Sequence, residues 1–333
     1  MKLKLDCPFC EGFAELKNEL RTVTYRKEEF NNYSFFYKCS NCGKDFTTTE
    51  IDDVNVNQIY NQYREKYSIP FPQQLIAIKE NYNLSSAKMS EILGLGANQY
   101  RLYEGGEMPS SSTGTLLSLI MNPKDFKDLI LRKKETLKIP EKVFSHLNDL
   151  ILQQKAEAKE LKEIIFNSSI IPNRFTGFSI PNFEKFAHIV IYFLKEAFLV
   201  TRLNKYLFYA DFLNYKRSGF SISGYNYAAI PLGPVPQDYK TVYDLLEEHN
   251  YISTVGYETE YDTTEKFVQT KDFDSSLFTP LELESLELVK QKLAPLKTKT
   301  IIDMSHEEPG WLANKEKKEL ISYQKYAFYL KHF

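Results

Sequence analysis

The chain has 333 residues, enough for two or three domains, and its 14% aromatic content predicts well-filled cores. A formal net charge of −2 gives no overall electrostatic basis for binding nucleic acid or a membrane surface. No apolar run reaches transmembrane length, and residues 1–6 lack the apolar core of a signal peptide, so no membrane association is expected.

All four cysteines lie in two CxxC pairs, Cys7 with Cys10 and Cys39 with Cys42. This spacing is typical of a tetrahedral zinc site in which every ligand is a thiolate. A thioredoxin-like redox motif needs one CxxC beside a βαβ pattern, and two disulfides would imply secretion. We therefore predict a structural Zn²⁺ ion and a reducing, cytoplasmic location. A four-thiolate shell has no open position, so the ion organises a fold and does not catalyse.

Residues 1–68 are predicted to form a zinc ribbon. Strands are expected at 22–25 and 33–37, where β-branched and aromatic residues are frequent. A turn-prone polar stretch, 27–32, separates them, and a further strand is expected at 45–49. A module of this size depends on its metal for much of its folding free energy.

Residues 69–122 have the pattern of a helix-turn-helix DNA-binding domain. Helices are expected at 74–80, at 84–93 with Ser85 or Ser86 as its N-cap, at 97–104 and at 116–121. Gly94 and Gly96 lie in the turn between the second and third helices.

The third of these helices carries the predicted DNA contacts. Tyr100 and Tyr103 are expected to face inward, which leaves Asn98, Gln99 and Arg101 exposed near the helix start. The simpler alternative is a helical hairpin that binds nothing. Acidic and basic residues are about equally numerous over 1–135, so no broad basic face supports the DNA-binding interpretation.

The ribbon and the sequence from Leu93 to Gly106, LGLGANQYRLYEGG, together resemble the MqsA family of antitoxins over residues 1–122. In that family an Xre-type domain represses the antitoxin's own operon. The resemblance implies that Asn98 reads bases and that the protein binds operator DNA as a homodimer. The family's arginine lies one position later, about 100° around the helix, so Arg101 is expected to contact phosphate.

Residues 123–172 are charged and helical, with segments expected at 125–137 and 142–165. The polar stretch 153–163 favours a solvated helical linker. A dimerising helix is the alternative, although no heptad pattern is sustained.

Residues 173–333 are predicted to form a mostly helical domain with a small β element. Helices are expected at 183–198, 203–213, 239–250 and 280–293, and a β-like insert at 258–268. The prolines of 230–236 require an extended backbone.

This half lacks the signature of an enzyme. Its sequence His306–Trp311 begins like a zincin motif but has no second histidine, and Pro309 would break the required helix. Asp211 lies among tyrosines and is expected to be hydrogen-bonded within the fold. We expect no catalytic site.

The same half resembles the Panacea domain, also described as SocA-like and, in phages, GepA-like. The matching segments are Leu203–Phe212, Ser223–Gly224, Pro231–Pro236, Ser305–His306 and Trp311. The resemblance implies an antitoxin domain that neutralises a toxin by direct protein contact. Tyr225, Tyr227, Pro234 and Val235 are the candidate toxin contacts, because this segment is aromatic and rigid. The alternative is that they pack the domain core.

The combined prediction is a multidomain, mainly α protein: a zinc ribbon, a helix-turn-helix, a helical linker and a Panacea domain. It would act as a type II antitoxin that binds a partner toxin and represses its own operon, with the zinc ribbon as a scaffold. The alternatives are a stand-alone phage or mobile-element repressor and a protease adaptor for a bound toxin.

Overall fold

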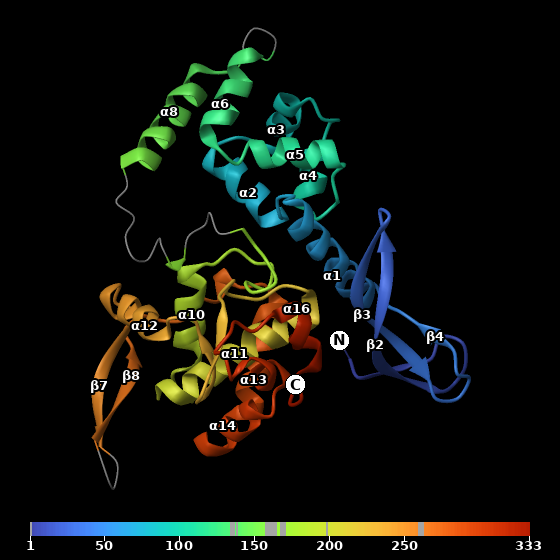
Figure 1. Ribbon diagram of the computed structural model, residues 1–333, viewed down its shortest axis with the longest axis vertical. Helices are drawn as coiled ribbons and strands as arrows, with labels where there is room; N and C mark the ends of the chain where they lie inside the picture. The colour runs from blue at the N-terminus through green and yellow to red at the C-terminus, as the bar shows by residue number, and fades with distance from the viewer. Residues whose placement is uncertain are drawn as a thin grey trace. The chain divides into compact units, whose positions relative to one another are not determined.

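The computed structural model describes residues 2–133, 137, 139–156, 165–166, 171–197, 199–258 and 263–333 (Figure 1). The chain divides into two compact units. The first combines Met1–Ile59 with Ile165–Phe333, and the second is Tyr60–Ile164. The protein is mostly helical, with a small antiparallel sheet at its N-terminus.

The N-terminal sheet has four antiparallel strands in chain order. They are β1 (Lys4–Asp6), β2 (Phe13–Tyr25), β3 (Glu28–Cys39) and β4 (Asp45–Phe46). The predicted hairpin is confirmed, but it is much longer than the sequence indicated. Arg26 and Lys27 both adopt positive φ, 49° and 69°, as a two-residue hairpin turn requires. Because the turn is this tight, residues 28–32 belong to a strand and not to the predicted loop.

Helix α1 (Thr49–Tyr67) follows the sheet and was absent from the sequence prediction. Its ends favour a helix, with Glu50 and Asp52 in the first turn and Arg64 and Lys66 in the last. Its inward face includes the fully buried Gln58, however. A buried face with such polar residues gives no clear apolar period, which explains why the sequence did not reveal the helix.

The second unit is a helical domain with one hydrophobic core. Ser85 is the N-cap of α3, as predicted, and accepts a hydrogen bond from the backbone N–H of Lys88. Gly94 ends the same helix in the left-handed conformation. The remaining helices of this unit are α2 (Pro72–Asn81), α3 (Ser86–Leu93), α4 (Gln99–Glu104), α5 (Ser111–Leu119), α6 (Pro123–Arg132) and α8 (Glu141–Ala156).

Helices α6 and α8 belong to this core, although the sequence suggested a solvated linker. Phe126 and Leu147 are fully buried in the same cluster as Leu75 of α2. Tyr82 stacks on Phe126 with ring centroids 4.5 Å apart. The charged composition of the segment concealed this inward face. Residues 157–164 and 167–170 of the predicted linker lie outside the described residues.

The C-terminal part of the first unit is built around helix α11 (Val200–Ser218), which is buried over most of its length. Two short hairpins, β5–β6 and β7–β8, accompany the surrounding helices. Predicted helices at 239–250 and 280–293 are present with at most two residues of difference, whereas the helix predicted at 183–198 ends at Phe193. The other elements are α10 (Phe183–Phe193), β5 (Tyr227–Ile230), β6 (Gly233–Pro236), α12 (Tyr239–Glu248), β7 (Ile252–Glu258), β8 (Thr263–Gln269), the 3₁₀ turns η1 (Ser275–Leu277) and η2 (Ala327–Tyr329), α13 (Pro280–Leu293), α14 (Thr298–His306), α15 (Pro309–Asn314) and α16 (Tyr323–Tyr326).

The N-terminal sheet packs on this C-terminal part within the first unit. The ring of Tyr33 in β3 stacks on Phe328 at 5.0 Å and meets Tyr329 edge-on at 4.9 Å. The side-chain amide of Asn57 also donates to the backbone carbonyl of Ser218. The ribbon predicted from the cysteines is therefore not isolated from the C-terminal domain. Among the helices described, none is both long and apolar enough to span a bilayer.

Candidate functional site

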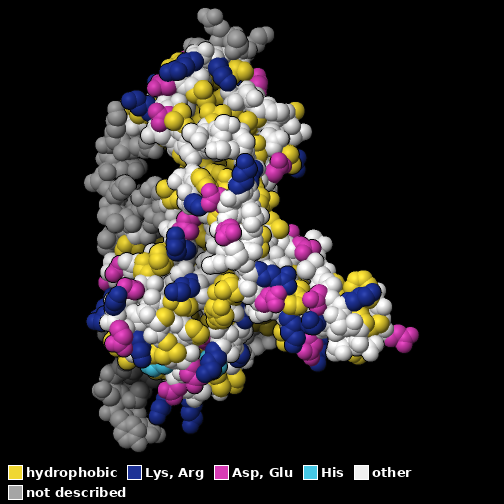
Figure 2. All heavy atoms as spheres, turned by 45° about the vertical axis from the view of Figure 1, so that its right-hand side comes forward, with side chains coloured by type: hydrophobic (Ala, Val, Ile, Leu, Met, Phe, Trp, Pro, Cys, Tyr) yellow, Lys and Arg dark blue, Asp and Glu magenta, His cyan; other side chains and the backbone are white. Residues whose placement is uncertain are grey.

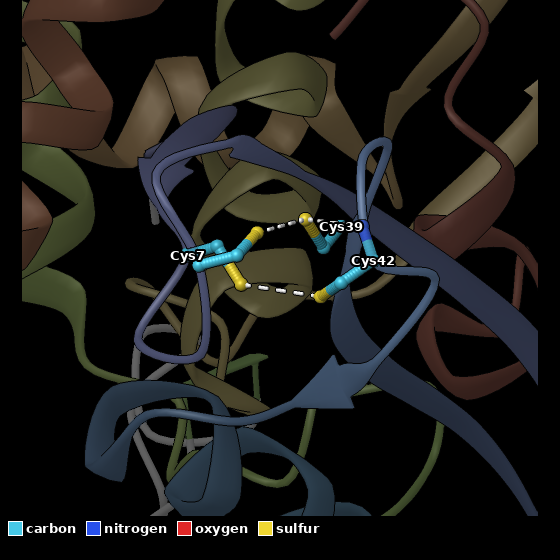
Figure 3. Close-up of side chains that lie close together, drawn as sticks. Cys7, Cys39 and Cys42 are labelled. Atoms are coloured by element: carbon cyan, nitrogen blue, oxygen red, sulfur yellow. Dashed lines mark hydrogen bonds between the residues drawn. The ribbon is translucent and has the colours of Figure 1, made fainter.

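The four cysteines converge from two turns of the N-terminal sheet, as their spacing predicted (Figure 3). One turn joins β1 to β2 and carries Cys7 and Cys10, and the other joins β3 to β4 and carries Cys39 and Cys42. All four sulfur atoms lie within 4.8 Å of one another. The cluster could therefore hold a metal ion.

The distances between these sulfur atoms fit a tetrahedral thiolate shell. The Sγ atoms of Cys7 and Cys42 are 3.7 Å apart, and those of Cys10 and Cys39 are 3.6 Å apart. In a tetrahedron with metal–sulfur bonds of about 2.3 Å, neighbouring sulfurs lie about 3.8 Å apart. The residues present thus fit a bound ion with no open coordination position.

Backbone N–H groups point at the sulfur atoms of Cys39 and Cys10 and favour the thiolate form of these two residues. The N–H of Cys42 and then that of Asn41 lower the pKa of the Cys39 thiol to about 6. The N–H of Gly12 and the Asn41 side chain lower the pKa of Cys10. A thiolate is the form that binds metal, so Cys10 and Cys39 are prepared for coordination. Burial and hydrogen bonds with the neighbouring cysteines raise the pKa of Cys42 to about 11.

Gly12 is required by the closeness of the two turns. A Cβ atom at this position would lie 2.6 Å from the Cβ of Asn41 and 3.3 Å from the sulfur of Cys10. A side chain there would push the turns apart and with them the sulfur atoms.

The predicted DNA-contacting residues lie at the start of α4 in the second unit. Asn98 precedes the helix in the left-handed conformation, φ 66°, and is exposed together with Arg101. Gln99 is half-buried and donates to the carboxylate of Glu107 at 3.2 Å. The structure thus leaves Asn98 and Arg101 accessible and engages Gln99 within the domain.

The two tyrosines of α4 face inward, as predicted, and hold the helix in place. Tyr100 is fully buried, and its hydroxyl donates to the carbonyl of Leu75 at 2.8 Å. Its backbone N–H donates to the Ser90 hydroxyl of α3 at 3.0 Å. Tyr103 is also buried. These contacts fix α4 against α2 and α3. On the face drawn in Figure 2, basic and acidic side chains are interspersed.

The residues predicted to contact a toxin are in the interior of the C-terminal domain. Tyr225, Tyr227 and Val235 are at most 5% exposed, and Pro234 is buried. Side chains in these positions cannot reach a partner while the domain is folded. Their burial agrees with the alternative that they pack the core. The exposed apolar residue of this hairpin is Leu232 in the turn between β5 and β6, at 59% exposure.

Asp211 of α11 organises the segment 222–227 that leads into β5. It is buried, and its Oδ1 accepts hydrogen bonds from the backbone N–H groups of Ile222 and Ser223 at 2.8 and 2.9 Å. Its Oδ2 accepts from the hydroxyls of Ser223 and Tyr227 at 2.6 and 2.8 Å. Burial raises the pKa of Asp211, and these hydrogen bonds oppose the rise. The prediction that Asp211 is hydrogen-bonded within the fold is confirmed.

Lys205 is a further buried group whose role the sequence did not reveal. It is fully buried on α11, and its Nζ donates to the carbonyl of Pro234 at 3.0 Å. Burial lowers the pKa of Lys205 to about 7. The signal was available, because Lys205 is followed directly by the apolar and aromatic run Tyr206–Ala210. Lys205 fastens β6 to α11.

His306 and Trp311 form a stacked pair near the turn of the same hairpin. Their ring centroids are 4.1 Å apart with an interplanar angle of 10°. The indole N–H of Trp311 donates to the carbonyl of Ile230 at 2.7 Å. The motif that began like a zincin sequence thus supports the end of β5, next to the turn that exposes Leu232.

Comparison with known families identifies this region. Residues 203–312 match the family described as "Antitoxin SocA-like, Panacea domain". The match includes α11, the β5–β6 hairpin and the His306–Trp311 pair. The comparison with curated proteins gives no match. Residues 203–312 therefore form a SocA-like Panacea domain, which supports a general antitoxin role for this protein.

Proposed function

We propose that the protein is the antitoxin of a type II toxin–antitoxin system and neutralises a protein toxin by direct contact through its C-terminal domain. The observation that carries this proposal is the SocA-like Panacea domain at 203–312. The protein would act in the cytoplasm and without catalysis. The buried side chains of Lys205 and Asp211 are engaged in holding the hairpin and α11 together.

The β5–β6 turn is the part of the domain that we propose faces the toxin. Leu232 projects there from a hairpin whose backbone is held by Lys205 and Trp311. A rigid turn loses little conformational entropy on binding, so an exposed apolar residue at its tip can contribute most of its burial to affinity. This surface replaces the buried residues that the sequence suggested.

A growth-rescue assay tests both parts of this proposal. The open reading frame adjacent to the gene is induced alone, and then together with the full chain. Toxicity that the full chain relieves supports an antitoxin, whereas a harmless neighbour would favour the stand-alone repressor. Leu232→Glu should reduce the rescue. Leu288→Glu, which changes another exposed leucine of the domain, is the matched control and should not reduce it.

We further propose that the second unit binds operator DNA and represses the operon, with the protein as a homodimer. Support comes from α3 and α4, whose turn presents the exposed side chains of Asn98 and Arg101 at the start of α4. An asparagine there can read adenine, and an arginine can contact phosphate.

Binding of a labelled duplex from upstream of the gene tests this part. Asn98→Gly keeps the left-handed backbone accessible and removes only the amide, so it should cost about 1–3 kcal/mol and relax sequence preference. Arg101→Ala should weaken binding to all sequences and reduce the salt dependence. Arg132→Ala removes the same charge from an exposed position of α6 and is the control. Equal effects at Arg101 and Arg132 would count against a specific interface.

The cysteine cluster is proposed to hold one structural Zn²⁺ ion as a scaffold for the ribbon. Cys7, Cys10, Cys39 and Cys42 would bind it, and the ion would supply cross-linking of the two turns and no reaction chemistry. Native mass spectrometry and elemental analysis should find about one zinc per chain. Cys39→Ser should lose it, and Ser40→Ala, at the neighbouring exposed position, should retain it. A metal-free wild-type chain with folded turns would contradict the assignment.

A further inference from the structure

The outer edge of strand β2 is exposed along most of its length. Beyond Glu15, where β1 ends its pairing, β2 pairs only with β3 among the strands of the described residues. Lys17 to Thr22 are six consecutive exposed residues. A long, uncovered strand edge is a template for pairing with another strand.

The register of the hairpin shows which backbone groups point outward from this edge. The backbone N–H and C=O of Tyr33 and Phe35 in β3 point away from β2, toward α1. Their partners in β2 are Leu20 and Asn18, which therefore point away from β3. The N–H of Leu16 follows the same alternation and donates outward to the carbonyl of Leu3. By this alternation, the backbone groups of Asn18, Leu20 and Thr22 face outward.

The opposite edge of the hairpin is covered by side chains. The amide of Asn55 both accepts from and donates to the backbone of Phe35, at 2.8 and 3.0 Å. Gln58 does the same for Tyr33, at 3.0 and 3.1 Å. Two amides of α1 thus take the place of a strand on β3. Because β3 is closed in this way, the edge of β2 is the surface where the sheet can grow.

We propose that this edge pairs with the same edge of a second copy of the chain, antiparallel and centred on Leu20. Leu20 then lies opposite Leu20 of the second copy, and Asn18 lies opposite Thr22. All three are outward-facing positions, so both N–H and C=O of each find partners. Glu19 lies opposite Arg21 of the second copy, and the symmetry repeats this ion pair on the other side of the axis.

The charges on β2 disfavour the two registers centred one residue away from Leu20. Centring the pair on Glu19 would place Glu19 opposite itself and Lys17 opposite Arg21. Centring it on Arg21 would place Arg21 opposite itself. Both registers also bring outward-facing backbone groups together, but they set like charges directly opposite each other. Centring it on Asn18 would place Lys17 opposite Glu19, but it would also place Leu20 opposite Leu16, whose N–H already donates to Leu3 of its own chain. Charge and the pairing of β1 together therefore favour the register centred on Leu20.

Different interactions contribute affinity and specificity in this pairing. Leu20 is 53% exposed and would be covered by its counterpart, and the ladder hydrogen bonds would satisfy the edge. Glu19 and Arg21 already contact each other within one chain, and both side chains are half-exposed. Exposed ion pairs add little free energy to binding, so we infer that these pairs determine the register and contribute little to the affinity. This inference does not depend on the antitoxin proposal.

Charge reversal on the full chain tests the pairing, with mass measured by light scattering or sedimentation over a concentration series. Arg21→Glu and Glu19→Arg each convert both ion pairs into like-charge pairs and should weaken dimerisation about tenfold. Mixing the two single variants should restore a dimer, because each carries the charges that the other lacks. The double variant, Glu19→Arg with Arg21→Glu, should restore it in one chain.

Lys17→Glu is the matched control, since it reverses a charge on the same strand that lies opposite no charged residue. It should leave dimerisation unchanged. Hydrogen exchange supplies a second measurement without any variant: outward amides of Asn18, Leu20 and Thr22 should be protected at high protein concentration and not at low. A wild-type chain that stays monomeric, a dimer indifferent to Arg21→Glu, or equal weakening by Lys17→Glu would overturn the proposal.

Discussion

Removing the carboxylate of Asp211 should destabilise the C-terminal domain strongly. Asp211→Ala leaves the backbone N–H groups of Ile222 and Ser223 and the hydroxyls of Ser223 and Tyr227 without their acceptor. Asp211, Ser223 and Tyr227 are all at most 1% exposed, so water cannot replace the carboxylate without opening the domain.

The magnitude follows from these groups. A buried polar group without a partner costs about 1–3 kcal/mol, and four are created. Relief of the desolvated carboxylate, which the raised pKa of Asp211 indicates, offsets part of this cost. We expect a net loss of about 3–5 kcal/mol. Asp211→Asn should cost less, because its amide oxygen can still accept from the two backbone N–H groups.

The assay is chemical denaturation of the full chain followed by tryptophan fluorescence. Trp311 is the single tryptophan of the sequence and stacks on His306, so its emission reports on this domain. Asp272→Ala removes an exposed carboxylate and is the control. A loss below about 1 kcal/mol for Asp211→Ala would refute the claim that this network holds the hairpin to α11.

Three further predictions concern other parts of the chain. Lys205 has a pKa of about 7 in the folded domain, below its unfolded value, so the folded state binds fewer protons and the free energy of unfolding should rise with pH between about 7 and 10. Lys205→Met should flatten this rise, measured by the unfolding transition of Trp311 fluorescence. An unchanged slope would contradict the assignment. Gly224→Ala would place a Cβ atom 2.5 Å from the carbonyl group of Ile180, at a residue whose φ is +71°. This substitution should destabilise the domain by about 3 kcal/mol or more, measured by thermal unfolding. Gly256→Ala, where nothing lies near the added atom, is the comparison and should cost less. Removal of bound metal by a chelator should raise hydrogen exchange in the turns at 7–12 and 39–44 while β7 and β8 keep their protection, and unchanged exchange in the turns would argue against a structural ion.

Local patterns were read correctly from the sequence. The cysteine pairs were predicted to meet and do so, because each CxxC turn is determined by a few adjacent residues. Ser85 was one of the two residues predicted as the N-cap, and Tyr100 was recognised as a buried residue, for the same reason. The prolines of 230–236 excluded a helix, and β6 is extended as expected.

Features that depend on what packs against a segment were missed. Helix α1 has fully buried Gln58 where an apolar residue would have revealed it. Helices α6 and α8 looked like a linker because their charged residues outnumber the few, such as Phe126 and Leu147, that enter the core. Tyr225 and Val235 have the composition of an interaction surface but lie inside the domain.

The sequence by itself determined the cysteine cluster that could hold a metal ion, the extended proline segment and most helices of the C-terminal half, since these follow from short-range spacing and backbone restriction. Only the tertiary structure decided which aromatic residues are buried and which groups Lys205 and Asp211 contact by hydrogen bonds. It also decided that the outer edge of β3 is covered while that of β2 is exposed. Burial and strand edges depend on partners distant in the chain, and no local pattern records whether such a partner is present.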